Sequence, residues 1–142
     1  MAELLARQCG VERQRIVQIA QPVPQHVTLG LGEKGLHPQI AGCAKPIRLL
    51  FLAAYYRHKN HAILPAVARE LRHRRMENQV QIFVTLDERQ SACSDVRRRI
   101  REYPDVITNL GRLPPTEVAG ALRASTALFL PTLVESYGLT YL

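Results

Sequence analysis

The 142-residue sequence lacks a long apolar run, a signal-like N-terminus and a cysteine framework. No stretch approaches the roughly 18 consecutive apolar residues that indicate a membrane-spanning helix. Residues 1–16 have no basic region followed by a long apolar run, so we expect no secretory signal. The three cysteines, Cys9, Cys43 and Cys93, are odd in number and far apart, and no CxxC pair occurs. This pattern argues against disulfides or a zinc site and favours reduced thiols in a cytosolic protein.

Several signatures of catalysis and cofactor binding are also missing. No GxGxxG follows the first predicted strand, and no GxxxxGK[ST] occurs, so neither the dinucleotide fingerprint nor an ordinary P-loop is present. The five histidines show no HExxH spacing and there is no DxD, so a protein-bound metal is not supported. One plausible catalytic carboxylate, Glu135, stands at a predicted strand end, which argues against the two-carboxylate arrangement of most glycosidases.

The composition that remains is that of one basic, compact domain. Apolar residues make up 46% of the chain and charged residues 22%, which is enough to bury a core. The net charge of +7 favours anionic partners such as phosphates, nucleic acid or lipid headgroups. Much of the excess lies in two arginine runs, residues 72–75 and 97–101, for which a solvated helix face is the simpler interpretation. Aromatic residues are only 6% and no nucleic-acid motif occurs, so we expect no nucleic-acid partner.

The chain changes character after a connector rich in glycine and proline. Residues 2–9 are typical of the end of a helix, and residues 15–20 alternate like a short strand. Residues 28–46 have little periodicity and indicate a linker. From residue 47 onwards, apolar runs alternate with stripes at helical spacing, in the order strand, helix, strand, helix, strand, helix, strand. The predicted strands cover residues 47–53, 80–84, 106–110 and 127–130.

This alternation predicts an α/β fold with a Rossmann-like, doubly wound parallel sheet of about four strands, incomplete relative to a full domain. The first helix is expected to begin near residue 60, with Asn60 as its N-cap. Pro65 lies about one turn in, where it could cost a hydrogen bond or shift the start by a residue. The second helix is marked by Val96, Ile100 and Tyr103, and the third opens at Pro115. In such sheets, ligands bind beyond the carboxyl ends of the strands.

The turn after the first predicted strand combines positive charge with an expected helix start. Arg57 and Lys59 lie there, and a helix N-terminus offers free N–H groups and a positive dipole end. The combination suits a diphosphate whose charge grows as it becomes a leaving group. The alternative is a solvated turn with incidental basic residues.

Two further strand ends carry candidate residues. After the fourth strand, Glu135 could bind sugar hydroxyls or lie beside a developing cationic sugar carbon, and Gly138 permits close backbone approach. Taken alone, Glu135 is better explained as a carboxylate that stabilises a helix dipole. After the third strand, Gly111 and Arg112 fit either contact with a flat base or a simple turn.

These segments together resemble a known family. Tyr55-Tyr56-Arg57-His58-Lys59-Asn60, then Asn109-Leu110-Gly111-Arg112-Leu113, then Pro131-Thr132-x-x-Glu135-Ser136-Tyr137-Gly138-Leu139 occur in that order. The order and spacing resemble the C-terminal, donor-binding domain of retaining glycosyltransferases of family 4, which have two Rossmann-like domains. The resemblance covers roughly residues 46–142. It implies that residues 1–27 end an N-terminal acceptor domain, residues 28–46 are a linker, and residues 47–142 form the first part of the nucleotide-sugar-binding domain.

The resemblance implies roles for the candidate residues. Lys59, with Arg57 nearby, would contact the donor diphosphate, and Glu135 would lie near the donor sugar as the catalytic carboxylate. The backbone around Ser136, Tyr137, Gly138 and Leu139 would approach the sugar and phosphates, and Gly111 and Arg112 would lie near the nucleobase. The donor would be a UDP- or GDP-sugar, with no cofactor or metal, and the acceptor and pathway stay open.

Two departures from the family pattern bear on activity. Ala54 stands where the family usually has an arginine that shares the phosphate charge. The second glutamate of the pair would fall at position 143, after Leu142. We therefore expect this chain by itself to be inactive in transfer. The alternative is a non-catalytic nucleotide-binding or interaction module that has lost activity.

Three expectations concern partners and location. An open edge at the fourth strand predicts self-association. The cytoplasm is the expected location. The resemblance adds peripheral contact with the inner face of a membrane, which the basic helices would make through anionic lipid.

Overall fold

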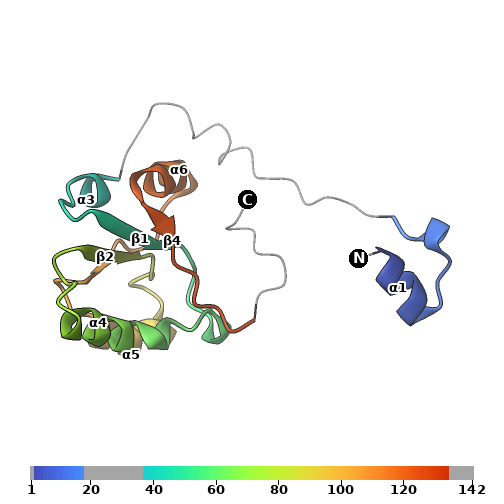
Figure 1. Cartoon of the computed structure of the whole chain (residues 1–142), viewed down its shortest axis with the longest axis horizontal. Coiled ribbons are helices and arrows are strands. Elements are labelled where there is room, and N and C mark those ends of the chain that lie inside the picture. The colour runs from blue at the N-terminus through green and yellow to red at the C-terminus, as the bar shows by residue number, and fades with distance from the viewer. Residues whose placement is uncertain (1, 18–36, 135–142) are drawn as a thin grey trace.

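The computed structural model describes residues 2–17 and 37–134 (Figure 1). The first of these parts holds α1, Ala2–Cys9, which confirms the helix expected there. A 3₁₀ turn follows at Arg13–Arg15, closed by the N–H of Arg15 on the carbonyl of Glu12 at 2.9 Å. The strand predicted over residues 15–20 is therefore wrong at Arg15, because local hydrogen bonds satisfy the backbone there. Residues 18–20 lie outside the described residues.

The second part is an α/β domain built on a parallel sheet, which confirms the predicted fold class. Its strands are β1, Ile47–Phe51; β2, Val80–Val84; β3, Ile107–Asn109; and β4, Ala127–Leu128. They are hydrogen-bonded in the order β3-β2-β1-β4, and every pair is parallel. β4 is thus an edge strand of the described sheet, and self-association through it stays a prediction.

Helices cover both faces of this sheet (Figure 1). α4, Leu64–His73, and α5, Ser94–Ile100, lie on one face. α3, Pro38–Ala41, and α6, Pro115–Ala124, lie on the other. Alternate strand residues enter the two cores: Phe51 and Ile82 pack on the α4 and α5 side, and Leu50 and Phe83 pack on the α3 and α6 side. Burial on both faces explains why these strands read as continuous apolar runs.

Three of the strands are shorter than predicted. β1 was expected to reach residue 53 but ends at Phe51. The N–H of Ala53 instead donates to the hydroxyl oxygen Oγ1 of Thr85 at 3.2 Å, which takes it out of the ladder. β3 begins at Ile107 and β4 ends at Leu128. β2 has the predicted bounds.

The start of the first predicted helix needs correction. α4 begins at Leu64, and two 3₁₀ turns, Arg57–Lys59 and His61–Ile63, precede it. Asn60 joins these turns in the left-handed region, with φ 58° and ψ 37°, and its side chain makes no capping hydrogen bond. Asn60 is therefore not the N-cap of α4. Pro65 lies in the first positions of α4, where its missing N–H costs nothing. The helix therefore begins further along the chain than the shift of one residue that was expected from Pro65.

Tyr103 also lies outside the helix in which its spacing placed it, because α5 ends at Ile100. It is buried in the core beneath the guanidinium of Arg72, which lies 4.6 Å from the ring centroid. The third helix begins at Pro115 as predicted.

The described part of the predicted linker packs onto the sheet. α3 begins after His37, and its Ile40 is fully buried against Leu50 and Phe83. A four-residue helix is too short to show the apolar periodicity on which the sequence analysis depends.

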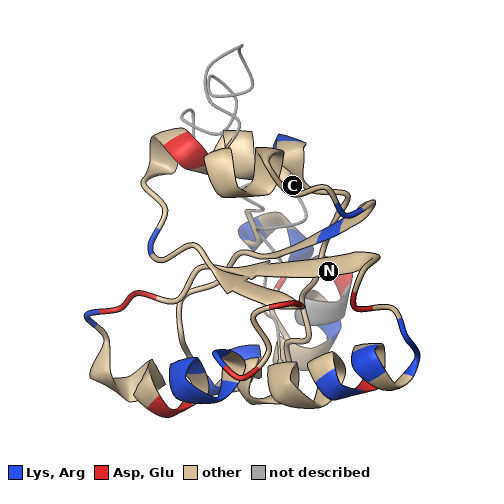
Figure 2. Cartoon of the chain, turned by 90° about the vertical axis from the view of Figure 1, so that its left-hand side faces the viewer, with Lys and Arg blue, Asp and Glu red and all other residues tan. Residues whose placement is uncertain are grey.

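The arginine runs lie on α4, on α5 and at their ends, where Figure 2 shows basic residues along both helices. Three of these arginines form ion pairs. Arg72 binds the carboxylate of Asp105, Arg74 binds Glu70 at 2.6 Å, and Arg98 binds Asp95. These pairs fit a solvated, ion-paired helix face. In both described parts, no helix is long and apolar enough to cross a membrane.

Candidate functional site

The loops after the four strands gather at the carboxyl edge of the sheet. The order β3-β2-β1-β4 reverses direction between β1 and β4, because β2 and β3 lie on one side of β1 and β4 lies on the other. Open α/β sheets bind ligands at such a switch point, outside the carboxyl ends of the strands. The loops that follow β1 and β4 therefore border the expected crevice.

The turn after β1 contacts the segment after β4. Its 3₁₀ turn, Arg57–Lys59, presents the carbonyl of His58, which accepts the N–H of Leu133 at 2.8 Å. Arg57 is exposed and Lys59 is half-buried. The predicted diphosphate turn thus lies beside the chain that leads into Glu135. Glu135 itself and the predicted residues Ser136, Tyr137, Gly138 and Leu139 lie outside the described residues.

The source of the positive potential at this turn differs from the expectation. We predicted that Arg57 and Lys59 would lie at a helix N-terminus, but α4 starts only at Leu64, after a second 3₁₀ turn. The field of the helix dipole weakens beyond the terminal turn, so side-chain charge is the main attraction for an anion at residues 57–59.

His61, which begins the second 3₁₀ turn, is buried against aromatic residues. His61 is 1% exposed, and its ring stacks on Phe51 with a centroid distance of 4.2 Å, while the ring centroid of Tyr55 lies at 5.6 Å. Burial lowers the pKa of His61 to about 4, and the charge of Lys59 acts in the same direction. The carbonyl of Ala53 partly offsets these effects, although neither ring nitrogen reaches hydrogen-bond geometry with a described residue. His61 is therefore a neutral aromatic support at physiological pH.

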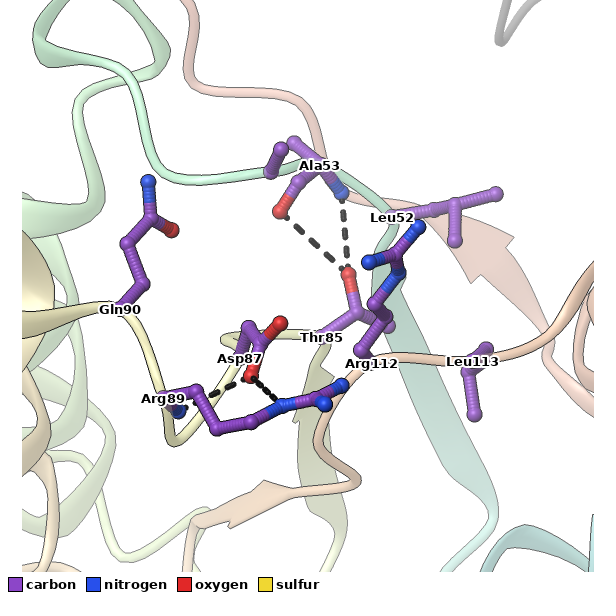
Figure 3. A pocket seen from close by; sticks show the side chains of 9 residues that line it. Leu52, Ala53, Thr85, Asp87, Arg89, Gln90, Arg112 and Leu113 are labelled. Atoms are coloured by element: carbon purple, nitrogen blue, oxygen red, sulfur yellow. Dashed lines mark hydrogen bonds and ion pairs between the residues drawn. The ribbon is translucent and has the colours of Figure 1, made fainter.

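A cleft of about 570 Å³ lies next to this turn, between the loops that follow β1, β2 and β3 (Figure 3). This volume is in the range of small-molecule sites. Residues of all three loops line it: Leu52, Ala53 and Ala54 after β1; Thr85, Asp87, Arg89 and Gln90 after β2; and Arg112 and Leu113 after β3.

The floor of the cleft is fixed by hydrogen bonds between the loops. Besides its bond to Ala53, Thr85 places its hydroxyl 3.4 Å from the carbonyl of Phe51. Asn109 links the second and third loops, since its amide accepts from the N–H of Leu86 at 3.0 Å and donates to the carbonyl of Leu86 at 3.1 Å. The same Asn109 oxygen accepts the N–H of Gly111 at 3.3 Å. These hydrogen bonds within the protein therefore hold the loops around the cleft in place.

The charges of the cleft come from one carboxylate and two arginines. Asp87 Oδ1 accepts the backbone N–H of Arg89 at 2.9 Å and lies 3.5 Å from Arg89 Nε. That backbone hydrogen bond, together with the charges of Arg89 and Arg112, lowers the pKa of Asp87 below its ordinary range. Asp87 is therefore ionised at neutral pH, and the guanidinium groups leave the cleft with a positive excess.

The predicted residues divide between the cleft and its border. Arg112 lines the cleft, and Gly111, with φ 74°, turns the chain just before it. Arg57 and Lys59 follow Ala54 on the same loop but do not line the cleft. Sequence reasoning missed Thr85, Asp87 and Arg89 as individual residues. The available signal was their position directly after the second predicted strand.

Among residues 2–17 and 37–134, no three His, Cys, Asp or Glu side chains gather closely enough to hold a metal ion. Cys9, Cys43 and Cys93 are free thiols, and Cys93 is buried. Comparison with models of protein families and with curated proteins finds no match to this chain. The proposed function therefore rests on the geometry of the carboxyl edge of the sheet.

Proposed function

We propose that the chain carries part of a nucleotide-sugar-binding domain of a glycosyltransferase that is retaining and independent of metal. The observation that carries the proposal is the position of two positively charged sites along one sheet edge. The cleft with Arg89 and Arg112 lies beyond β1, β2 and β3, and the Arg57–Lys59 turn lies at the switch point beside the segment after β4. A ligand with a nucleoside and a diphosphate is the small-molecule class that fits both.

In this proposal the nucleoside occupies the cleft and the diphosphate extends along the loop after β1. Lys59 and Arg57 neutralise the phosphate oxygens by charge-assisted hydrogen bonds. The sugar then faces the segment after β4, where the family resemblance places Glu135. The hydrogen bond from Leu133 to His58 holds the turn after β1 and the segment after β4 side by side.

A second candidate function is a nucleotide-binding module without transferase activity. Ala54 favours it, since this exposed residue lines the cleft and brings no charge to it. The two candidates share the binding step and differ in whether a sugar is transferred. Transfer also needs an acceptor held against the donor, so the isolated chain is expected to bind without turnover.

Titration calorimetry with GDP and UDP tests the shared step. We expect the chain to bind a nucleoside diphosphate and the Lys59→Ala variant to bind it about tenfold more weakly, which corresponds to the loss of one charge-assisted contact. Arg69→Ala is the matched control, because it removes one exposed cation from α4, where alanine is well tolerated. Absence of nucleotide binding by the unaltered chain, or an equal loss in both variants, contradicts the proposal.

A further inference from the structure

The cleft contains a carboxylate that a pure phosphate site would not need. Asp87 shares the cleft with Arg89 and Arg112 and comes from the loop after β2 (Figure 3). A carboxylate repels phosphate oxygens, so its presence weakens a site built for phosphate alone. The part of a ligand that contacts Asp87 has to present N–H or O–H donors.

Asp87 keeps acceptor capacity that faces the cleft. Its Oδ1 carries the contacts to Arg89, whereas Oδ2 makes no hydrogen bond to any residue in 37–134. In Figure 3 this second oxygen is turned away from Arg89, towards the side of the cleft on which Thr85 and Ala53 lie. An ionised carboxylate has about four acceptor positions and no donor. Oδ1 accepts one short hydrogen bond, since its 3.5 Å separation from Arg89 Nε is too long for a second strong one. Asp87 can therefore accept two neighbouring donors from a ligand, one on each oxygen.

Arg112, which lines the same cleft as Asp87, favours the opposite kind of ligand group, one that accepts hydrogen bonds. Its guanidinium is exposed, lines the same cleft and contributes to the electrostatic field on the Asp87 carboxylate. Guanidinium groups donate in a planar fork and pair well with two acceptors on the edge of a base. The cleft thus offers an acceptor pair next to a donor fork.

Of the common bases, guanine matches this pattern. Its N1–H and its N2 amino group are adjacent donors that a carboxylate can accept together, and its O6 and N7 are acceptors for arginine. Uracil has a single N–H between two carbonyl oxygens, so one of those oxygens would face the carboxylate. Adenine and cytosine each place an unprotonated ring nitrogen beside their amino group, which a carboxylate also repels.

We propose that this cleft recognises guanine, with Asp87 accepting from N1–H and the N2 amino group and Arg112 donating to O6 or N7. The inference rests on the proposed nucleotide-sugar function and narrows the donor to a GDP-sugar. Asp87 is then the residue that determines base specificity, and Lys59 is independent of it.

The test compares GDP, UDP and xanthosine diphosphate on the unaltered chain and on Asp87→Asn, by titration calorimetry. Xanthine carries an oxygen in place of the N2 amino group of guanine. We expect the unaltered chain to bind GDP at least tenfold more tightly than UDP, because only guanine offers the adjacent donors and acceptors that Asp87 and Arg112 can pair with. Asp87→Asn should lose about tenfold in affinity for GDP and gain for xanthosine diphosphate, because its amide can donate to that oxygen.

The reversal of preference separates recognition from unfolding, because a misfolded variant loses all three ligands. Asp95→Asn is the matched control, as it removes an exposed carboxylate from α5 and should leave the three affinities unchanged. Binding of GDP and UDP within threefold of each other, with Lys59→Ala weakening both, overturns the guanine inference and leaves the proposed function standing. Absence of binding by all three nucleotides overturns both.

Discussion

The two ends of the parallel sheet are built in different ways. At the amino end, side chains tie the strands together. Lys45 Nζ donates to the carbonyl of Val80 at 3.3 Å and to the carbonyl of Asp105. At the carboxyl end, the side chains of Thr85 and Asn109 also join the loops, but these loops border an open cleft, and the side chain of Arg89 is 83% exposed.

A second set of contacts extends the closure of the amino end. The hydroxyl of Thr126, just before β4, accepts the N–H of Arg48 at 3.0 Å and lies 3.3 Å from the carbonyl of Pro46. Arg72 also closes this end by binding Asp105. At the amino end, Lys45 and Arg72 are thus bound within the protein, whereas Arg89 and Arg112 at the carboxyl end are exposed.

The difference teaches which substitutions should change stability and which should change binding. A group whose hydrogen-bonding capacity is used inside the protein stabilises the fold, and its loss is felt in unfolding. A group that is held in place but accessible to solvent contributes little to the free energy of unfolding and much to the affinity for a ligand. Substitutions at the two ends of the sheet can therefore test this division.

His61 lies at the carboxyl end yet is expected to act on stability. Its pKa is about 4 in the folded chain against an ordinary 6.5, so the unfolded chain binds more protons between these values. Stability is therefore complete above about pH 6.5 and falls as the pH drops towards 4, by roughly 3 kcal/mol in total. Urea unfolding at pH 7, 5.5 and 4.5 measures it.

The His61→Phe variant keeps an aromatic ring on Phe51 and removes the titrating group. We expect its unfolding free energy to fall less steeply with acid than that of the unaltered chain. His73→Gln, which alters an exposed histidine of α4, is the control and should keep the full acid sensitivity. Equal pH dependence of His61→Phe and the unaltered chain would contradict the assignment.

Lys45 represents the closed end of the sheet. Lys45→Met keeps the aliphatic stem and deletes the ammonium group that bonds two carbonyls. We expect a loss of about 1–2 kcal/mol in the free energy of unfolding, from two hydrogen bonds at a partly buried site. Nucleotide affinity of the folded variant should not change. A fall in affinity without a fall in stability would break the division between the two ends.

Gly111 gives the smallest expected effect and tests the rim of the cleft. Its φ of 74° is in the left-handed region, and an added Cβ would meet no heavy atom within 4 Å. Gly111→Ala should therefore cost only conformational strain, about 1 kcal/mol in unfolding. Gly111→Asn should cost less, because asparagine tolerates this region. Equal costs for the two variants would show that side-chain contacts, and not φ, decide the outcome.

Sequence pattern was sufficient for the sheet and insufficient for the turns. The buried strands show as apolar runs because helices cover both faces, so β2 has its predicted bounds. The β1–α4 connection was misjudged at Asn60, because a left-handed residue between two 3₁₀ turns has no apolar periodicity to reveal it. The helix-start rule then placed Lys59 in a stronger dipole field than the fold provides.

The candidate site shows a similar limit. Arg112 was predicted from its position after a strand, and the structure places it in the cleft. Asp87 and Arg89 were not singled out, because their significance depends on loops from β1 and β3 that approach them in space. Sequence order identifies the ends of strands, but only the folded sheet determines which ends face one another.

The brevity of β4 has a consequence for the switch point. β4 pairs with β1 through two residues, Ala127 and Leu128, and has no further strand beside it in the described sheet. Local opening of so short a pairing is less costly than opening of β2, which is paired on both sides. Release of β4 together with the segment that follows it would also break the hydrogen bond from Leu133 to His58, which joins that segment to the turn after β1. A ligand that contacts both the turn after β1 and the segment after β4 would bind only the closed state and would therefore stabilise it. The pairing of β4 would then open less often than in the ligand-free chain.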